Sequence, residues 1–206
     1  MERIEVNTAW SAGVSRLNAT MRTASPGEVA HAALVADAAR GSVRAFETLY
    51  RIYRPRLARF LQRLTHRPQL TEELINDTML AVWHRAHTYN GHSKVSTWIF
   101  AIGYRKALKA RKRLDDPVHA DPDTEPTSAA PEGELLQLER NARIGTAMRA
   151  LSAEHRAVIE LSYFQDFDYP QIAAIVHCPL GTVKTRMFHA RRKLERLLAG
   201  ERESLR

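Results

Sequence analysis

The sequence predicts an all-α protein made of two small helical domains that are joined by a flexible acidic linker. Apolar residues recur at steps of three and four through residues 27–113 and again through 135–198, which is the spacing of amphipathic helices. Between these blocks, residues 114–134 lose that spacing and become polar and proline-rich. Residues 1–26 show little periodicity and are predicted to be a disordered extension, and the second domain is assigned to residues 135–206.

The amino-terminal block predicts four helices. An apolar stripe through Leu34 and Ala38 predicts the first helix, and Gly41 suits its end. The second helix covers residues 46–64. Pro55 is expected to bend or split it, because proline lacks the amide donor that a helix interior needs.

The third helix of this block is expected to begin at Thr71, because Thr71 and Glu73 suit a helix amino terminus. A turn-rich loop follows at residues 89–93. The fourth helix is expected to open at Ser96 or Thr97 and to continue into a basic stretch.

The segment between the blocks is acidic. Residues 115–134 hold seven Asp and Glu residues and four prolines, with no Lys or Arg. Such a chain is too polar and too proline-rich to bury a core, so it is predicted to be a linker.

The carboxy-terminal block predicts a helix-turn-helix. Apolar spacing indicates one helix before Ser152 and another after it. Asp168 can cap the next helix, and Pro170 suits its first turn. Residues 177–179 interrupt the pattern, and the last helix opens at residues 181–182, so two helices are joined by a turn of about four residues.

The start of that last helix also resembles a phosphate-binding loop. Such a loop needs the spacing GxxxxGK[ST] after a strand. Here Lys184 lies three residues after Gly181, no glycine precedes it at the required spacing, and the preceding segment is predicted to be helical. The nucleotide-binding interpretation is therefore disfavoured.

The last helix has two different faces at about 100° per residue. Its apolar face is predicted to be Val183, Met187, Ala190 and Leu194. The opposite face carries Thr185, Phe188, His189 and Arg192, flanked by Lys184 and Arg191. A solvated basic face would not explain Phe188. In a DNA major groove, Phe188 could contact a thymine methyl while the basic residues reach guanines or phosphates, so a DNA-binding role is favoured.

A second basic helix is predicted at residues 103–113, which hold six Lys and Arg residues and no acid. It follows the polar loop and Trp98, a combination that suits melted or single-stranded DNA. For Trp98 the sequence leaves base stacking and core packing open, whereas Trp83 is assigned to the core.

Composition limits the remaining classes of function. The net charge is +8 and the isoelectric point about 10.0, which suits a polyanionic partner. One cysteine, Cys178, excludes an internal disulfide, and the lack of a signal-type or membrane-length apolar run predicts a cytoplasmic protein. His177 and Cys178 have no second pair of ligands, so no metal or cofactor is predicted.

Two blocks resemble a known family. The stretches TEELINDTMLAVWHRA and KVSTWIFAIGYRKALKARKR resemble domain 2 of the extracytoplasmic-function (ECF) sigma factors, the smallest class of the sigma-70 family, and LSAEHRAVIELSYFQDFDYPQIAAIVHCPLGTVKTRMFHARRKL resembles domain 4. The resemblance covers residues 34–198. It implies a bacterial, non-enzymatic subunit that joins core RNA polymerase, recognises the −10 and −35 promoter elements and helps to melt DNA.

The resemblance also implies partners and contact residues. The partners are promoter DNA, the clamp helices of the largest polymerase subunit and the flap region, and an anti-sigma factor is the further partner that the family allows. The implied −35 contacts are Lys184, Thr185, Arg186, Phe188, His189, Arg191 and Arg192. The implied −10 contacts are Tyr89, Asn90, Gly91, His92, Lys94, Trp98, Arg105, Lys106 and Lys109. The implied polymerase contacts are Glu72, Glu73, Asn76, Asp77 and Leu80.

Several positions depart from the family pattern. His177 stands where glycine is common, which is expected to strain the turn, and His189 stands where arginine is frequent. Pro170 replaces a usual acid, Arg105 stands where asparagine is common, and residues 90–92 differ from the usual arginine-glycine-acid sequence. Two other functions are weighed against the sigma-factor interpretation. A stand-alone helix-turn-helix regulator that binds an operator would explain the second block only. The other alternative is a nucleotide-dependent enzyme, but the sequence shows no acid–base or metal-ligand cluster that would support it.

Overall fold

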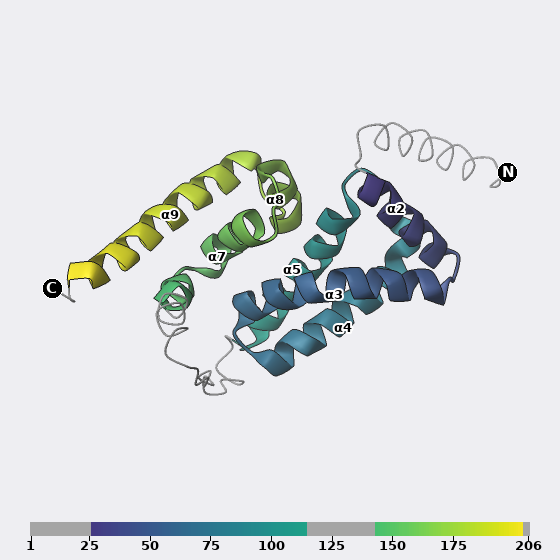
Figure 1. The fold of residues 1–206 in the computed structure, drawn as a ribbon, viewed down its shortest axis with the longest axis horizontal. Helices are drawn as coiled ribbons and strands as arrows, with labels where there is room; N and C mark the ends of the chain where they lie inside the picture. The colour runs from purple at the N-terminus through teal and green to yellow at the C-terminus, as the bar shows by residue number, and fades with distance from the viewer. Residues whose placement is uncertain (1–25, 115–142, 204–206) are drawn as a thin grey trace, which may run out of the picture.

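The structure is a computed structural model that describes residues 26–114 and 143–203. The predicted amino-terminal extension and acidic linker lie outside the described residues, except for Pro26 and Leu114, which belong to helices. Within the described residues every regular element is helical. The helices form two groups, one on each side of the acidic segment in the sequence (Figure 1).

The first group is a bundle around α3. Its elements are α2 (Pro26–Ala39), α3 (Val43–Thr65), α4 (Pro68–Arg85), the short 3-10 helix η1 (Ala86–Thr88) and α5 (Val95–Leu114). The apolar stripe of α3 is completely buried at Leu49, Tyr53, Leu57, Phe60 and Leu61. Since α2, α4 and α5 all pack against α3, this stripe forms the centre of the domain.

Helix α3 continues through Pro55, so the expectation that proline would split it is wrong. Pro55 is exposed, while the buried stripe runs on both sides of it in one core. The ends of the helix are well closed. The Ser42 hydroxyl accepts a hydrogen bond from the Ala45 amide at 3.3 Å, and His66 adopts a left-handed conformation at φ 58°. Packing and caps together outweigh one missing hydrogen bond.

Two helices begin earlier than the sequence predicts. Helix α4 begins at Pro68, where a first-turn proline costs no hydrogen bond, and Thr71 is buried inside the first turn. Helix α5 begins at Val95, whose amide donates to the Glu28 carboxylate of α2. The cap of α5 therefore comes from a residue far away in the sequence, which a local pattern does not reveal.

The second group contains the predicted helix-turn-helix. A helical segment at residues 143–149 is followed by α7 (Ala153–Ile159), the π-helical turn η3 (Glu160–Phe164), α8 (Tyr169–Val176) and α9 (Leu180–Glu203). Three residues separate α8 from α9, close to the turn of about four that the sequence predicts. Helix α9 is the longest element of this domain and extends away from the first domain (Figure 1).

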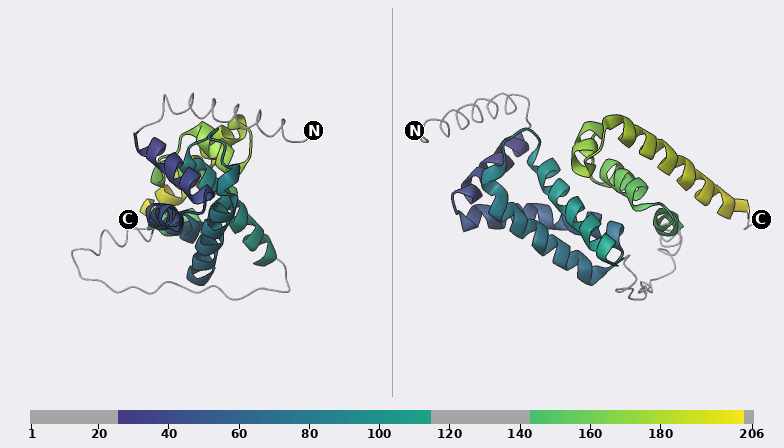
Figure 2. Two further views of the ribbon diagram at one scale, coloured as in Figure 1. Left: turned by 90° about the vertical axis from the view of Figure 1, so that its right-hand side faces the viewer. Right: turned by 180° about the vertical axis from the view of Figure 1, so that it is seen from behind.

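The two domains touch. Helix α8 packs against α5, and α3 contacts α7 and η3. Phe100 of α5 meets Phe167, just before α8, with ring centroids 5.0 Å apart. The right-hand view of Figure 2 shows the two helical groups side by side from behind.

Candidate nucleic-acid interface

Helix α8 is closed by a hydrogen-bonded cap at its start and by a left-handed residue at its end, where the turn to α9 begins. The Asp168 side chain accepts from the Gln171 amide at 2.8 Å, and the Gln171 side chain accepts from the Asp168 amide at 3.0 Å, which completes a capping box. After α8, His177 has φ 53° and ψ 54°, and this left-handed conformation is the strain that the sequence predicts for a histidine in a glycine position. The turn sets the direction in which α9 leaves the domain.

Helix α9 presents the two faces that its sequence predicts. Val183, Met187 and Ala190 are buried against the domain. The residues on the opposite side are exposed: Lys184, Thr185, Phe188, His189, Arg191 and Arg192. The side chain of Phe188 is 55% exposed, with the Arg192 guanidinium 5.6 Å from its ring centroid. A large aromatic side chain thus stands in solvent within a basic surface.

Arg186 lies away from this exposed face. It is half-buried, and its guanidinium approaches the Cys178 sulfur at 3.9 Å. It also lines a pocket with His155 of α7, Thr182 and His189. Arg186 therefore lies at the border between the buried and exposed faces of α9, where it adjoins His189 but is less exposed than the other residues predicted for −35 contact.

His155 is a candidate residue that sequence reasoning missed. It is half-buried on α7, and its ring centroid lies 6.4 Å from that of His189 on α9. The two residues meet only because α7 packs along α9, so no local sequence signal marks the pair.

The loop before α5 is closed by its own polar groups. The Tyr89 hydroxyl donates to the Ser93 carbonyl at 2.7 Å, and the Asn90 side chain accepts from the His92 amide at 3.1 Å. Gly91 sits at φ 71°, a conformation that favours glycine. Burial and the nearby charge of Glu28 raise the pKa of Tyr89 to about 12, so its hydroxyl stays neutral.

Trp98 packs against Tyr89, with ring centroids 5.2 Å apart, and is half-buried. Trp83 is also half-buried, in edge contact with Phe46 at 5.1 Å. The remaining predicted −10 residues divide by exposure. Asn90, His92, Lys94, Arg105 and Lys109 are exposed, Lys106 is half-buried, and Gly91 is buried.

Helix α4 separates a buried face from an acidic exposed face. The five residues predicted to bind polymerase are all exposed: Glu72, Glu73, Asn76, Asp77 and Leu80. Leu80 is 54% exposed, which is unusual for an apolar side chain of this size.

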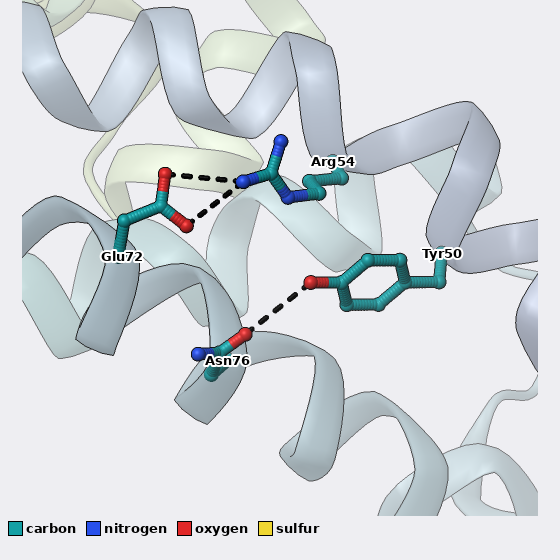
Figure 3. Close-up of polar contacts among 4 residues, drawn as sticks. All are labelled: Tyr50, Arg54, Glu72 and Asn76. Atoms are coloured by element: carbon teal, nitrogen blue, oxygen red, sulfur yellow. Dashed lines mark hydrogen bonds and ion pairs between the residues drawn. The ribbon is translucent and has the colours of Figure 1, made fainter.

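Several of these side chains already have partners inside the domain. Arg54 donates to both carboxylate oxygens of Glu72 at 3.2 and 2.9 Å, and the Tyr50 hydroxyl donates to the Asn76 side chain at 3.3 Å (Figure 3). Lys106 of α5 pairs with Asp77 at 3.2 Å. The last pair connects a predicted −10 residue with a predicted polymerase residue.

A polar network joins the two domains. Arg56 of α3 donates to the Gln165 carbonyl at 2.9 Å, and Arg63 pairs with Glu160 at 3.2 Å. Arg156 of α7 donates to the Leu64 carbonyl of α3 at 3.5 Å. Arg156 and Glu160 are both buried, so part of the contact between the domains is built from charged groups that are shielded from solvent.

The described residues offer neither a membrane span nor a metal centre. None of their helices is long and apolar enough to cross a membrane. No group of three or more His, Cys, Asp and Glu residues in the described ranges could hold a metal ion.

Comparisons with known proteins identify both domains. The family model for Sigma-70 region 2 matches residues 49–116, and that for Sigma-70, region 4 matches residues 141–194. These two regions define a protein of the sigma-70 class. The first match covers the amino-terminal block, which a stand-alone operator-binding regulator would leave unexplained.

Individual relatives show to which subgroup of the sigma-70 class the chain belongs. The chain is 32% identical over 149 residues to the ECF RNA polymerase sigma factor RpoE of Cereibacter sphaeroides, covering 69% of this chain and 80% of the relative. It is 30% identical to the ECF RNA polymerase sigma factor SigL of Mycobacterium tuberculosis, covering 79% of this chain and 93% of that protein. The chain therefore belongs to the ECF sigma factors of the sigma-70 family.

Solved structures agree with this assignment. The sigma factor RpoE from Bartonella quintana, in complex with the anti-sigma factor NepR, matches with a TM-score of 0.62 and 27% identity, over 76% of this chain and 98% of that one. The fold is also that of CnrH in complex with the cytosolic domain of CnrY, with a TM-score of 0.64 and 24% identity, over 83% of this chain and 98% of the other.

Proposed function

We propose that this chain joins bacterial core RNA polymerase in the cytoplasm and directs it to promoters through three separate surfaces. Residues 27–113 act as sigma domain 2 and residues 135–206 as sigma domain 4. The chain catalyses no reaction of its own, and its part is to bind and position DNA. The observation that carries the proposal is Phe188, exposed on α9 between cations and opposite a buried stripe.

The exposed face of α9 is the surface proposed for the −35 element. A helix of this kind lies in the major groove, where an apolar side chain contacts a thymine methyl and Arg or Lys contacts guanines. Phe188 supplies the apolar contact, and Lys184 and Arg192 supply the cations on either side of it. The capping box and the left-handed turn hold α9 in position for this contact.

The loop at residues 89–94 and helix α5 form the surface proposed for the −10 element. Extraction of a base from the stack costs a few kcal/mol, which contacts in a receiving pocket offset. The Tyr89–Trp98 pair and the closed loop provide an ordered aromatic surface for such a base. Arg105 and Lys109 are exposed on α5, where they can neutralise the DNA backbone.

The acidic face of α4 is the surface proposed for the clamp helices of the largest polymerase subunit. Glu73 is exposed, and Leu80 beside it offers an apolar contact. Arg54 and Lys106 hold Glu72 and Asp77 in defined positions before any partner arrives. The second domain is proposed to contact the flap region.

The contact between the domains has a consequence for this mechanism. Because α8 packs against α5, we propose that the two domains separate when the chain joins polymerase and engages two promoter elements. A partner that bridges both domains would favour the packed arrangement instead. An anti-sigma factor, the kind of partner named for the Bartonella relative, would act in this way.

Reconstitution tests the proposal. Purified chain is mixed with core polymerase, and the complex is followed on a sizing column and then by transcription from a library of promoter fragments from the same genome. The expected result is a stable complex and selective transcripts. Absence of a complex, or transcripts that do not depend on the added chain, would refute the assignment.

A further inference from the structure

A basic groove runs between α7 and α9, beside the face that carries Phe188. Its lining consists of His155, His189, Arg192, Lys193 and Arg196. None of these five residues is acidic. The groove is open at the surface, because His189, Arg192 and Arg196 are all exposed.

Packing sets the shape of this groove. Lys193 donates to the Ala150 carbonyl at 2.6 Å, which ties α9 to the turn that follows residues 143–149, and Arg196 donates to the Arg192 carbonyl at 3.4 Å. The rings of His155 and His189 lie 6.4 Å apart at an interplanar angle of 41°. Two titratable side chains thus stand among three permanent cations.

We propose that this groove binds one backbone phosphate of duplex DNA, and that His155 and His189 take up protons when the phosphate arrives. The inference rests on the proposed −35 role of α9. It adds α7 to the DNA-contact surface and makes the strength of the contact depend on pH.

Electrostatics give the sign of that dependence. Burial, the neighbouring His189 and Arg186, and also Lys193, lower the pKa of His155, while Glu154 opposes them. Hydrogen bonding to the backbone lowers the pKa of the Glu154 carboxyl; burial opposes this, and Ser152, Arg111 and Arg186 add to the lowering. Without DNA the groove therefore disfavours a charged His155 near neutral pH.

A bound phosphate reverses this preference, because an anion in contact with imidazole stabilises the protonated form. The pKa of His155 is then higher with DNA than without it. The extra affinity is fully present below the pKa of the free protein and is lost as pH rises through the pKa of the complex. DNA binding is thus expected to strengthen as pH falls.

The test uses the full chain and a duplex of about 20 base pairs of mixed sequence, since a phosphate contact does not require a particular sequence. Affinity is measured by fluorescence anisotropy at constant ionic strength. Between about pH 8 and pH 6 the wild type is expected to bind roughly tenfold more tightly, and H155Q/H189Q to change by less than about twofold. Histidine ring NMR should show an upward pKa shift for His155 on addition of duplex.

Matched variants test whether the two histidines of the groove cause the pH dependence of DNA binding. H84Q removes an exposed histidine of α4 and should leave the wild-type pH dependence intact. H155K/H189R carries fixed charges and should bind tightly at both pH values. R196A should weaken binding. It should also reduce, by about one unit, the slope of the logarithm of the binding constant against the logarithm of the salt concentration.

The outcomes distinguish the two proposals. If the wild type binds duplex and H155Q/H189Q keeps its pH dependence, the groove inference is wrong and the −35 role of α9 stands. If the wild type binds no duplex at any pH in low salt, both are overturned.

Discussion

Arg63 of α3 and Glu160 of η3 form an ion pair across the boundary between the two domains, with 3.2 Å between Nη1 and Oε2. The Glu160 side chain is 2% exposed, whereas that of Arg63 is 43% exposed. Burial raises the pKa of Glu160 to about 7, and Arg63 acts in the opposite direction. The pair therefore joins the domains through a carboxyl group that is about half protonated at neutral pH.

Glu160→Gln is expected to remove a pH dependence of stability. A pKa of about 7 lies above the ordinary value of 4.5, so between these values the folded protein holds a proton that the unfolded chain releases. Stability of the wild type should fall as pH rises through this window, by on the order of 1–3 kcal/mol. Urea unfolding followed by circular dichroism between about pH 5 and pH 8 measures the difference. Equal pH slopes in wild type and variant would contradict the role of Glu160, and Glu47→Gln on the exposed surface of α3 is the control.

Arg156→Lys is expected to destabilise the protein by about 2–4 kcal/mol, because an ammonium group cannot replace the branched guanidinium. Arg156 donates to the carbonyls of Met148, Arg149 and Leu151, at 2.7 to 3.0 Å, and it reaches His66 Nε2 at 2.7 Å. Arginine only donates, so the Nε2 atom of His66 must accept. The urea midpoint measures the loss. Arg149→Lys, at an exposed position, should stay close to wild type, and a similar loss in both variants would show that the buried network is not the cause.

Phe188→Ala and Arg192→Ala are expected to reduce transcription from promoters that depend on a −35 element. Each should cost about 1–3 kcal/mol of the binding free energy that distinguishes the −35 sequence from other sequences. Both variants should still join core polymerase, because the polymerase surface is proposed on α4 and not on α9. Neither substitution changes the buried apolar stripe of α9. Transcription and sizing-column assays are run in parallel. Arg44→Ala, an exposed arginine on α3, serves as the control. Loss of polymerase binding in the α9 variants would mean that the assigned division between surfaces is wrong.

Glu73→Lys is expected to have the opposite effect. It reverses a charge on the exposed acidic face of α4, so binding of core polymerase should weaken while binding of duplex DNA by the free chain is retained. Competition with the wild type for a limiting amount of polymerase gives the change in affinity. Glu47→Lys makes the same charge change on α3 and should compete normally, and equal competition by Glu73→Lys would remove α4 from the polymerase interface.

Prediction from the sequence succeeded where information lies within one or two helical turns. The faces of α9 follow from the positions of Val183, Met187 and Phe188, and the caps at Ser152 and Asp168 follow from the residue types that accept amide hydrogen bonds. The strained turn at His177 was instead expected from the resemblance to the family, in which glycine is common at that position. The expected break at Pro55 failed, because a local rule does not include the core that both halves of α3 share.

The candidate site was only partly predictable for the same reason. Arg186 belongs to the basic stretch of α9 by sequence, yet its place beside the buried stripe turns it toward Cys178 and His155. His155 carries no signal of its own, and it enters the site only through the packing of α7 on α9. Contacts between residues that are far apart in the sequence depend on how all the helices of the core pack together.

The sequence by itself determined that this chain is helical, where most helices lie, and that α9 has one buried and one basic face, because helical periodicity is written into neighbouring residues. The tertiary structure alone decided that Glu28 caps α5, that Arg63 meets Glu160 and that His155 meets His189. These contacts join residues that are far apart in the chain. They form only when apolar burial brings whole helices together, and burial does not by itself specify which polar groups will meet.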